Sequence, residues 1–113
     1  MRLPGGNHLD RRRQLLPKDY LAPPDAFGVS SEGTTVVPSG GDEVSAEVAR
    51  LQHHLVLAWR RAGCRPSGAA VARRFGFSRQ TWSRTMLGER WMGETLMTAL
   101  ISSIRASSGR LDR

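Results

Sequence analysis

The chain has 113 residues, of which 39% are apolar and only 6% aromatic, and it carries 17 Lys and Arg against 10 Asp and Glu. This length allows one small domain. No apolar run approaches the roughly 18 residues that a transmembrane helix needs, and the single cysteine, Cys64, excludes an intramolecular disulfide. We therefore expect a soluble, cytoplasmic protein rather than a membrane or disulfide-stabilised one.

The positive charge is concentrated in one part of the sequence. From Val44 onward there are 12 basic and 4 acidic residues, a net charge of +8, whereas residues 1–43 have 5 basic and 6 acidic residues, a net charge of −1. Cationic side chains that neutralise phosphates release condensed counterions and thereby gain free energy. The charge distribution predicts a nucleic-acid-binding surface in the C-terminal half, with acidic membrane lipid as the alternative.

The N-terminal part has the composition of a linker. Residues 22–42 are dense in Pro, Gly, Ser and Thr and contain few apolar residues to offset the entropy of ordering. We predict that residues 1–41 form a flexible, disordered N-terminal segment and linker. Within it, residues 9–21 could form one short helical turn that ends before Pro17, or could lie on the domain through Leu15, Leu16, Tyr20 and Leu21. The basic run Arg11 to Arg13 could reach a minor groove as an arm, but Asp10 and Asp19 dilute its charge and favour solvated disorder.

The first predicted helix begins after Asp42, a favourable N-cap, and ends at Gly63. Its apolar residues recur at steps of three and four, which predicts one buried stripe. The stripe comprises Val44, Val48, Leu51, Leu55, Ala58 and Ala62.

Three shorter helices follow. The sequence GAAVARRF predicts a helix that Gly76 ends, Ser78 caps the next helix, RQTWSRTML, and a final helix runs from Glu94 to Arg105. No alternating stretch is long enough to predict a sheet. The prediction is an all-α fold, a small helix-turn-helix bundle of four to five helices over residues 42–106, with residues 107–113 as a frayed tail.

The second and third helices carry the spacing of a helix-turn-helix. This motif needs a small residue in its first helix, a glycine at the turn and an apolar anchor in its second helix. Ala72, Gly76 and Trp82 occupy these places. The spacing predicts that a recognition helix, Ser78 to Leu87, enters the major groove of double-stranded DNA.

The sequence SGAAVARRFGFSRQTWSRTMLGER, followed by GETLMTAL, resembles the lambda-repressor-like (Cro-type) helix-turn-helix family over about residues 44–105. The resemblance implies that one preceding helix and one or two following helices surround the pair. It also implies that Arg79, Gln80 and Thr81 point at base edges. The chain departs from the family pattern at Gly68, where many members have a polar residue that braces the recognition helix, and at Thr85, where an aliphatic residue is usual.

The chemistry of these side chains supports the same site. Arg79 can donate two parallel hydrogen bonds to guanine, and Gln80 can pair similarly with adenine. Other arginines can contact phosphates, which position the protein without specifying sequence. We predict base contacts by Arg79, Gln80, Thr81 and Arg84, and phosphate contacts by Ser78, Ser83, Arg73, Arg74 and Arg90.

Aromatic and histidine residues have simpler interpretations. Helical spacing favours Trp59 and Trp82 as core residues rather than a stacking platform for single strands, whereas Trp91 could pack internally, touch a sugar or meet a second subunit. His53 and His54 diverge by roughly 100° on a helix, so a shared metal ion is not expected. No catalytic motif is present, and we predict no enzymatic activity, no cofactor and no metal.

The function that the sequence favours is sequence-specific DNA binding by a bacterial or phage transcriptional regulator, acting as a homodimer through its apolar C-terminal helix. Two alternatives stay open. One is a protein-interaction module, such as an antitoxin or phage modulator, whose N-terminal segment folds on a protein partner. The other is a sequence-independent nucleic-acid binder.

Overall fold

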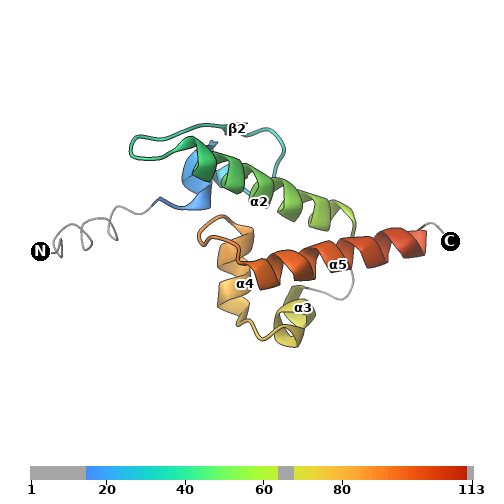
Figure 1. Ribbon diagram of the computed structural model, residues 1–113. Coiled ribbons are helices and arrows are strands. Elements are labelled where there is room, and N and C mark those ends of the chain that lie inside the picture. The colour runs from blue at the N-terminus through green and yellow to red at the C-terminus, as the bar shows by residue number, and fades with distance from the viewer. Residues whose placement is uncertain (1–14, 64–67, 112–113) are drawn as a thin grey trace, which may run out of the picture.

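The computed structural model describes residues 15–63 and 68–111, and this part of the chain is mostly helical, as predicted. Its four α-helices are α2 (Glu43–Arg61), α3 (Gly68–Arg74), α4 (Arg79–Met86) and α5 (Glu94–Leu111) (Figure 1). The turn around Cys64 lies outside the described residues. None of the described helices is long and apolar enough to cross a membrane.

The helix starts that were predicted from capping residues are confirmed. The Asp42 carboxylate accepts a hydrogen bond from the Ser45 amide at 2.7 Å, which begins α2. The Ser78 hydroxyl accepts from the Thr81 amide at 3.0 Å and begins α4. Gly76, at the turn between α3 and α4, has a φ of +82°, a conformation that glycine adopts without the steric cost of a Cβ.

All four α-helices contribute to one principal core. The Trp59 and Trp82 rings meet edge to face there, with their centroids 5.4 Å apart, and both indoles pack in the core as predicted. The buried members of the core are Val56, Val71, Ala72, Trp82, Met86, Leu96, Ala99 and Leu100.

The N-terminal segment, residues 15–41, is folded rather than flexible. It consists of the 3₁₀ helix η1 (Pro17–Tyr20), strand β1 (Leu21–Ala22), the 3₁₀ helix η2 (Pro24–Ala26) and strand β2 (Thr34–Thr35). The strands pair antiparallel, with Leu21 opposite Thr35. This corrects the expectation of a disordered linker for these residues and adds a short strand pair to the predicted all-α fold.

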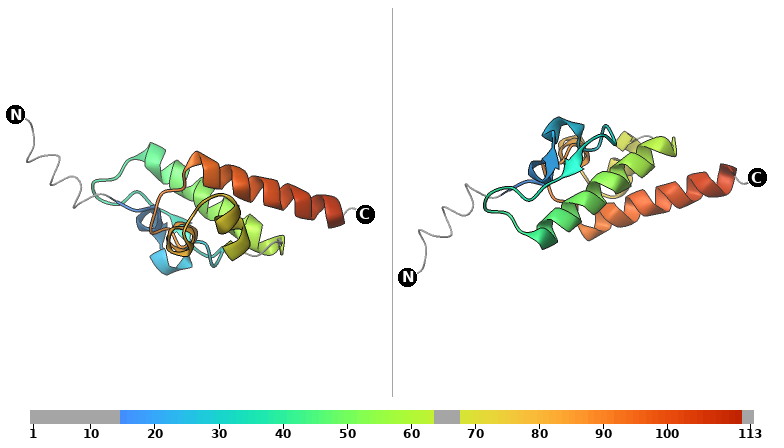
Figure 2. Two further views of the ribbon diagram at one scale, coloured as in Figure 1. Left: turned by 90° about the horizontal axis from the view of Figure 1, so that it is seen from below. Right: turned by 90° about the horizontal axis from the view of Figure 1, so that it is seen from above.

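The N-terminal segment is ordered because three of its large side chains are buried. Tyr20, Leu21 and Phe27 are at most 4% exposed, and they are buried in two small clusters beside the principal core. Both views in Figure 2 place α2 between α5 on one side and this segment on the other. The predicted basic arm, Arg11 to Arg13, lies outside the described residues.

Because two elements cover α2 from different sides, the buried face of this helix is not the predicted stripe. Val44 is 75% exposed, and Val48 and Leu51 are 44% and 54% exposed. Small residues, a glutamine and a histidine replace the predicted stripe at the interface. The buried residues of α2 are Ala46, Ala49, Gln52, His53, Val56 and Leu57.

Helix α5 is longer than predicted. It begins at Glu94 as expected but continues past Arg105 to Leu111. Extending an existing helix fixes one more residue for each hydrogen bond gained and needs no apolar contact. The backbone at residues 107–111 is therefore helical where a frayed tail was expected.

Candidate nucleic-acid interface

Helix α4 is buried on one side and open on the other. Trp82, Thr85 and Met86 are buried, and the buried Thr85 hydroxyl donates a hydrogen bond to the Thr81 carbonyl at 2.8 Å, so a threonine is accommodated where the resemblance implies an aliphatic residue. The opposite side carries only exposed side chains. This exposed face of α4 consists of Gln80, Ser83, Arg84 and Leu87.

The predicted base-contacting residues do not all lie on that face. Gln80 and Arg84 do, and Arg79 is exposed in the first turn. Thr81 is half-buried, and its hydroxyl accepts a hydrogen bond from Ser78 at 3.0 Å. Ser83, which was predicted to contact phosphate, lies on the same face as Gln80 and Arg84 because residues three and four apart share a helix side.

The predicted phosphate-contacting residues surround α4. Arg73 lies with Ser78 and Arg79 around an open hollow of about 500 Å³ at the turn between α3 and α4. Arg74 is exposed beside Phe75, with its guanidinium 5.4 Å from the ring centroid. Arg90 is exposed in the turn that follows α4.

The C-terminal end of α4 is held by a buried glutamine on α2. The Gln52 amide nitrogen donates to the carbonyl oxygens of Thr85 and Arg90, each at 3.0 Å, and its amide oxygen accepts from the Met92 amide at 3.0 Å. Gln52 is 3% exposed. A buried polar group must be hydrogen-bonded to be tolerated, and Gln52 meets this requirement while fixing the turn after α4.

The N-terminal segment supports the same end of α4. The Lys18 amide donates to the Gly88 carbonyl at 3.0 Å, and the Trp91 indole donates to the Leu15 carbonyl at 3.0 Å. Trp91 therefore packs internally, where the sequence left three possibilities open. Gly28 comes so close to α4 that a Cβ on it would lie 2.0 Å from the Met86 carbonyl oxygen.

A buried histidine connects this segment to α2. The Gly28 amide donates to Nδ1 of His53 at 2.9 Å, and the His53 ring lies 5.1 Å from that of Phe27. Burial, and secondarily the neighbouring His54, lower the pKa of His53 below its ordinary value. Neutral His53 can accept this hydrogen bond through Nδ1, whereas the protonated ring cannot.

Sequence reasoning missed the structural roles of Gly28, Gln52 and His53, although one signal indicated the face of α2 on which Gln52 lies. Ala46 and Ala49 precede Gln52 at three-residue steps, and small residues on a helix face allow a neighbouring segment to approach closely. Among the described residues, no cluster of His, Cys, Asp or Glu could hold a metal ion. Comparison of the chain with protein-family models, with curated proteins and with solved structures finds no match.

Proposed function

We propose that α3 and α4 form a helix-turn-helix, and that the chain is a sequence-specific DNA-binding protein of the transcriptional-regulator type. One observation carries the proposal. Helix α4 is fixed at its start by Ser78 and at its end by Gln52 and the N-terminal segment, while its exposed face presents Gln80, Ser83 and Arg84. A helix that is held rigidly and projects hydrogen-bonding groups outward suits the major groove.

The charge of the chain supports this partner. The net charge from Val44 onward is +8, and Arg73, Arg79 and Arg90 lie around α4. In the proposal, Gln80, Arg84 and Arg79 read base edges, and Ser83 contributes to the same face. The duplex is positioned by phosphate contacts, which come from Arg73, Arg74, Arg90 and Ser78.

The first test is selection of a binding site from a random duplex library, followed by titration with variants. We expect a defined motif to emerge, and Gln80→Ala and Arg84→Ala each to relax it at one position by roughly 1–3 kcal/mol. Arg105→Ala, an exposed arginine on α5, removes the same charge as Arg84→Ala and serves as the control. If no motif is enriched although duplex DNA is bound, the chain is a sequence-independent binder.

We further propose that the protein binds DNA as a homodimer through the outer side of α5. Met97 and Ile101 are 38% and 36% exposed on this helix, and a small domain gains affinity by occupying two half-sites about 34 Å apart. Sedimentation velocity should show a wild-type dimer and an Ile101→Glu monomer. Val44→Glu, on the exposed side of α2, is the control, and a monomeric wild type would refute the dimer.

The interaction-module alternative rested on an N-terminal segment that needed a partner to fold. Residues 15–41 pack against α2 and α4 of the same chain. The described part of that segment therefore no longer favours this alternative over DNA binding.

A further inference from the structure

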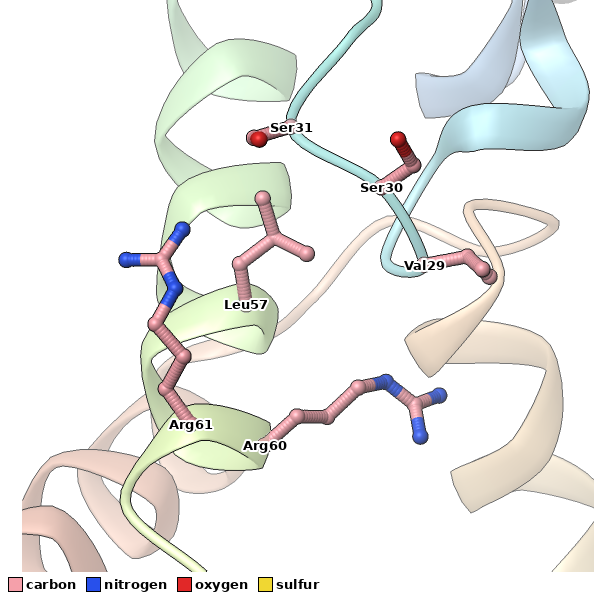
Figure 3. Close-up of a pocket in the computed structure, with 6 residues that line it drawn as sticks. All are labelled: Val29, Ser30, Ser31, Leu57, Arg60 and Arg61. Atoms are coloured by element: carbon pink, nitrogen blue, oxygen red, sulfur yellow. The ribbon is translucent and has the colours of Figure 1, made fainter.

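A second basic site lies on the opposite side of α4 from Arg90. It is an open hollow of about 420 Å³ between the end of α2 and the loop that follows η2. Figure 3 shows Arg60 extending toward α4 and Arg61 extending back along α2 toward Ser31. We call it the Arg60 hollow. Its lining residues are Val29, Ser30, Ser31, Leu57, Arg60 and Arg61.

The Arg60 side chain is held in place by one hydrogen bond, which leaves its other N–H groups available. Its Nε donates to the Gly28 carbonyl at 2.6 Å, which fixes the stem of the side chain, and no other hydrogen bond or ion pair of the guanidinium is found in the described part of the chain. The remaining guanidinium N–H groups form the planar fork that binds phosphate oxygens well. Figure 3 shows Ser31 on the side of Arg61. The lining residue next to the bond between Arg60 and Gly28 is Val29, which follows Gly28 in the loop.

Arg60 lies beside α4, at the place where one edge of the major groove would lie if α4 entered the groove. Arg60 also lines a smaller hollow with Ser83 and Leu87, on one side of the exposed face of α4. Arg90 lines a hollow with Thr81, on the other side. A helix in the major groove, which is about 12 Å wide, has one phosphate backbone on each side.

We propose that Arg60 binds a backbone phosphate on the DNA strand opposite the one that Arg90 faces. The inference rests on the proposed function and extends it, because it assigns a DNA contact to the end of α2, outside the helix-turn-helix. The contact is to phosphate, so it raises affinity for every duplex equally and leaves sequence preference to the exposed face of α4.

The test measures affinity for the selected duplex and for a scrambled duplex of the same composition, at several salt concentrations. We expect Arg60→Gln to weaken binding to both duplexes by the same factor, roughly tenfold. It should also reduce the slope of log K against log salt by about 0.9, the value for one phosphate. Arg50→Gln is the control on the same helix, since Arg50 pairs with exposed Glu47 and such pairs contribute little.

A second variant separates the contact from any effect on folding. Val29→Glu places a negative charge in the hollow next to the Gly28 carbonyl that Arg60 binds, without removing a hydrogen bond of Arg60, and Val37→Glu makes the same change at an exposed valine elsewhere in the segment. We expect Val29→Glu to weaken binding to both duplexes several-fold more than Val37→Glu.

The outcomes distinguish this inference from the function on which it rests. If the wild type binds a selected duplex but Arg60→Gln matches Arg50→Gln, or Val29→Glu matches Val37→Glu, the phosphate contact is wrong and the proposed function stands. If Arg60→Gln weakens only the selected duplex, Arg60 reads sequence and the contact is again wrong. If the wild type binds no duplex, both proposals fall.

Discussion

Gly28 occupies a point where two backbones meet, and a matched pair of substitutions can measure that contact. Its φ is +69°, and an added Cβ would lie 2.0 Å from the Met86 carbonyl oxygen, whereas Gly40 has a φ of +84° and open space around it. Gly40→Ala should cost roughly 1–2 kcal/mol, the penalty for a left-handed conformation. Gly28→Ala should cost roughly 1–3 kcal/mol more because packed backbone must move. Urea unfolding followed by tryptophan fluorescence measures both, and equal losses would contradict the close approach.

His53 makes stability depend on pH in a definite direction. Burial lowers its pKa in the folded state below the ordinary 6.5, so the unfolded chain takes up the proton first as pH falls. The contribution of neutral His53 to the free energy of unfolding is therefore present above about pH 6.5, and it is lost as pH falls through the lower pKa of the folded state. Between about pH 7.5 and about pH 5, the free energy of unfolding should fall more for the wild type than for His53→Gln.

This pH range separates the effect of His53 on stability from the effects of two carboxylates whose pKa is also lowered in the folded state. The Asp42 pKa is lowered by hydrogen bonds from Ser45, and the Glu47 pKa by its hydrogen bond with Arg50, from ordinary values of 3.8 and 4.5. Asp42 and Glu47 therefore lose their contributions to the free energy of unfolding only at pH values below this range. An identical pH dependence for the wild type and His53→Gln would show that the buried ring does not set it.

At the scale of elements, the four α-helices were predictable because their signals are local. Asp42 and Ser78 cap helices through bonds to residues three positions away, and Gly76 turns the chain without help from the rest of the molecule. What these signals do not contain is which side of a helix is covered. The first half of the predicted stripe on α2, Val44, Val48 and Leu51, is exposed because a segment that was predicted to be disordered covers the neighbouring side of the helix.

For the N-terminal segment, the sequence offered packing of Tyr20 and Leu21 on the domain as one possibility, and both are buried. The order of residues 22–41 could not be predicted, since the segment is held by contacts distant in sequence. Lys18 bonds to Gly88, Leu15 to Trp91, and Gly28 to His53. Composition and periodicity carry no information about such pairs. On α4, the exposed positions of Gln80 and Arg84 agree with their predicted place on the outward side of the helix, whereas Thr81, predicted beside them, is half-buried and Ser83 lies on their face instead. Arg60 is brought beside α4 only by the fold.

The coupling between the N-terminal segment and α4 can be tested with Phe27, which is 1% exposed. Phe27→Ala should lower the free energy of unfolding by roughly 3–5 kcal/mol. Native-state hydrogen exchange should show the Gly88 amide losing as much protection as the Lys18 amide, because the two elements open together. Val29→Ala, at a residue that is 60% exposed, should change the free energy of unfolding by less than about 0.5 kcal/mol. Loss of protection at Lys18 alone would mean that the segment opens independently of α4.

At the scale of the whole molecule, we expect a single unfolding transition. Trp59 and Trp82 report on the principal core, whereas Trp91 reports on the contact with Tyr20, with ring centroids 5.9 Å apart. In Trp91→Phe, fluorescence follows the core. In the double variant Trp59→Phe/Trp82→Phe, it follows the N-terminal contact. In each variant, fluorescence and far-UV circular dichroism should give the same urea midpoint. Different midpoints would show two separately stable parts.

The exposed face of α4 makes no side-chain hydrogen bond to the rest of the described chain, while the other sides of the helix are held by α2, α3 and the N-terminal segment. The exposed side chains are thus separate from those that keep the helix in place. Gln80, Ser83, Arg84 and Leu87 can be varied as a set, and a library randomised at these four positions would sample new binding chemistries on an unchanged backbone. The same separation would let substitutions on this face change its chemistry without loss of the structure that presents it.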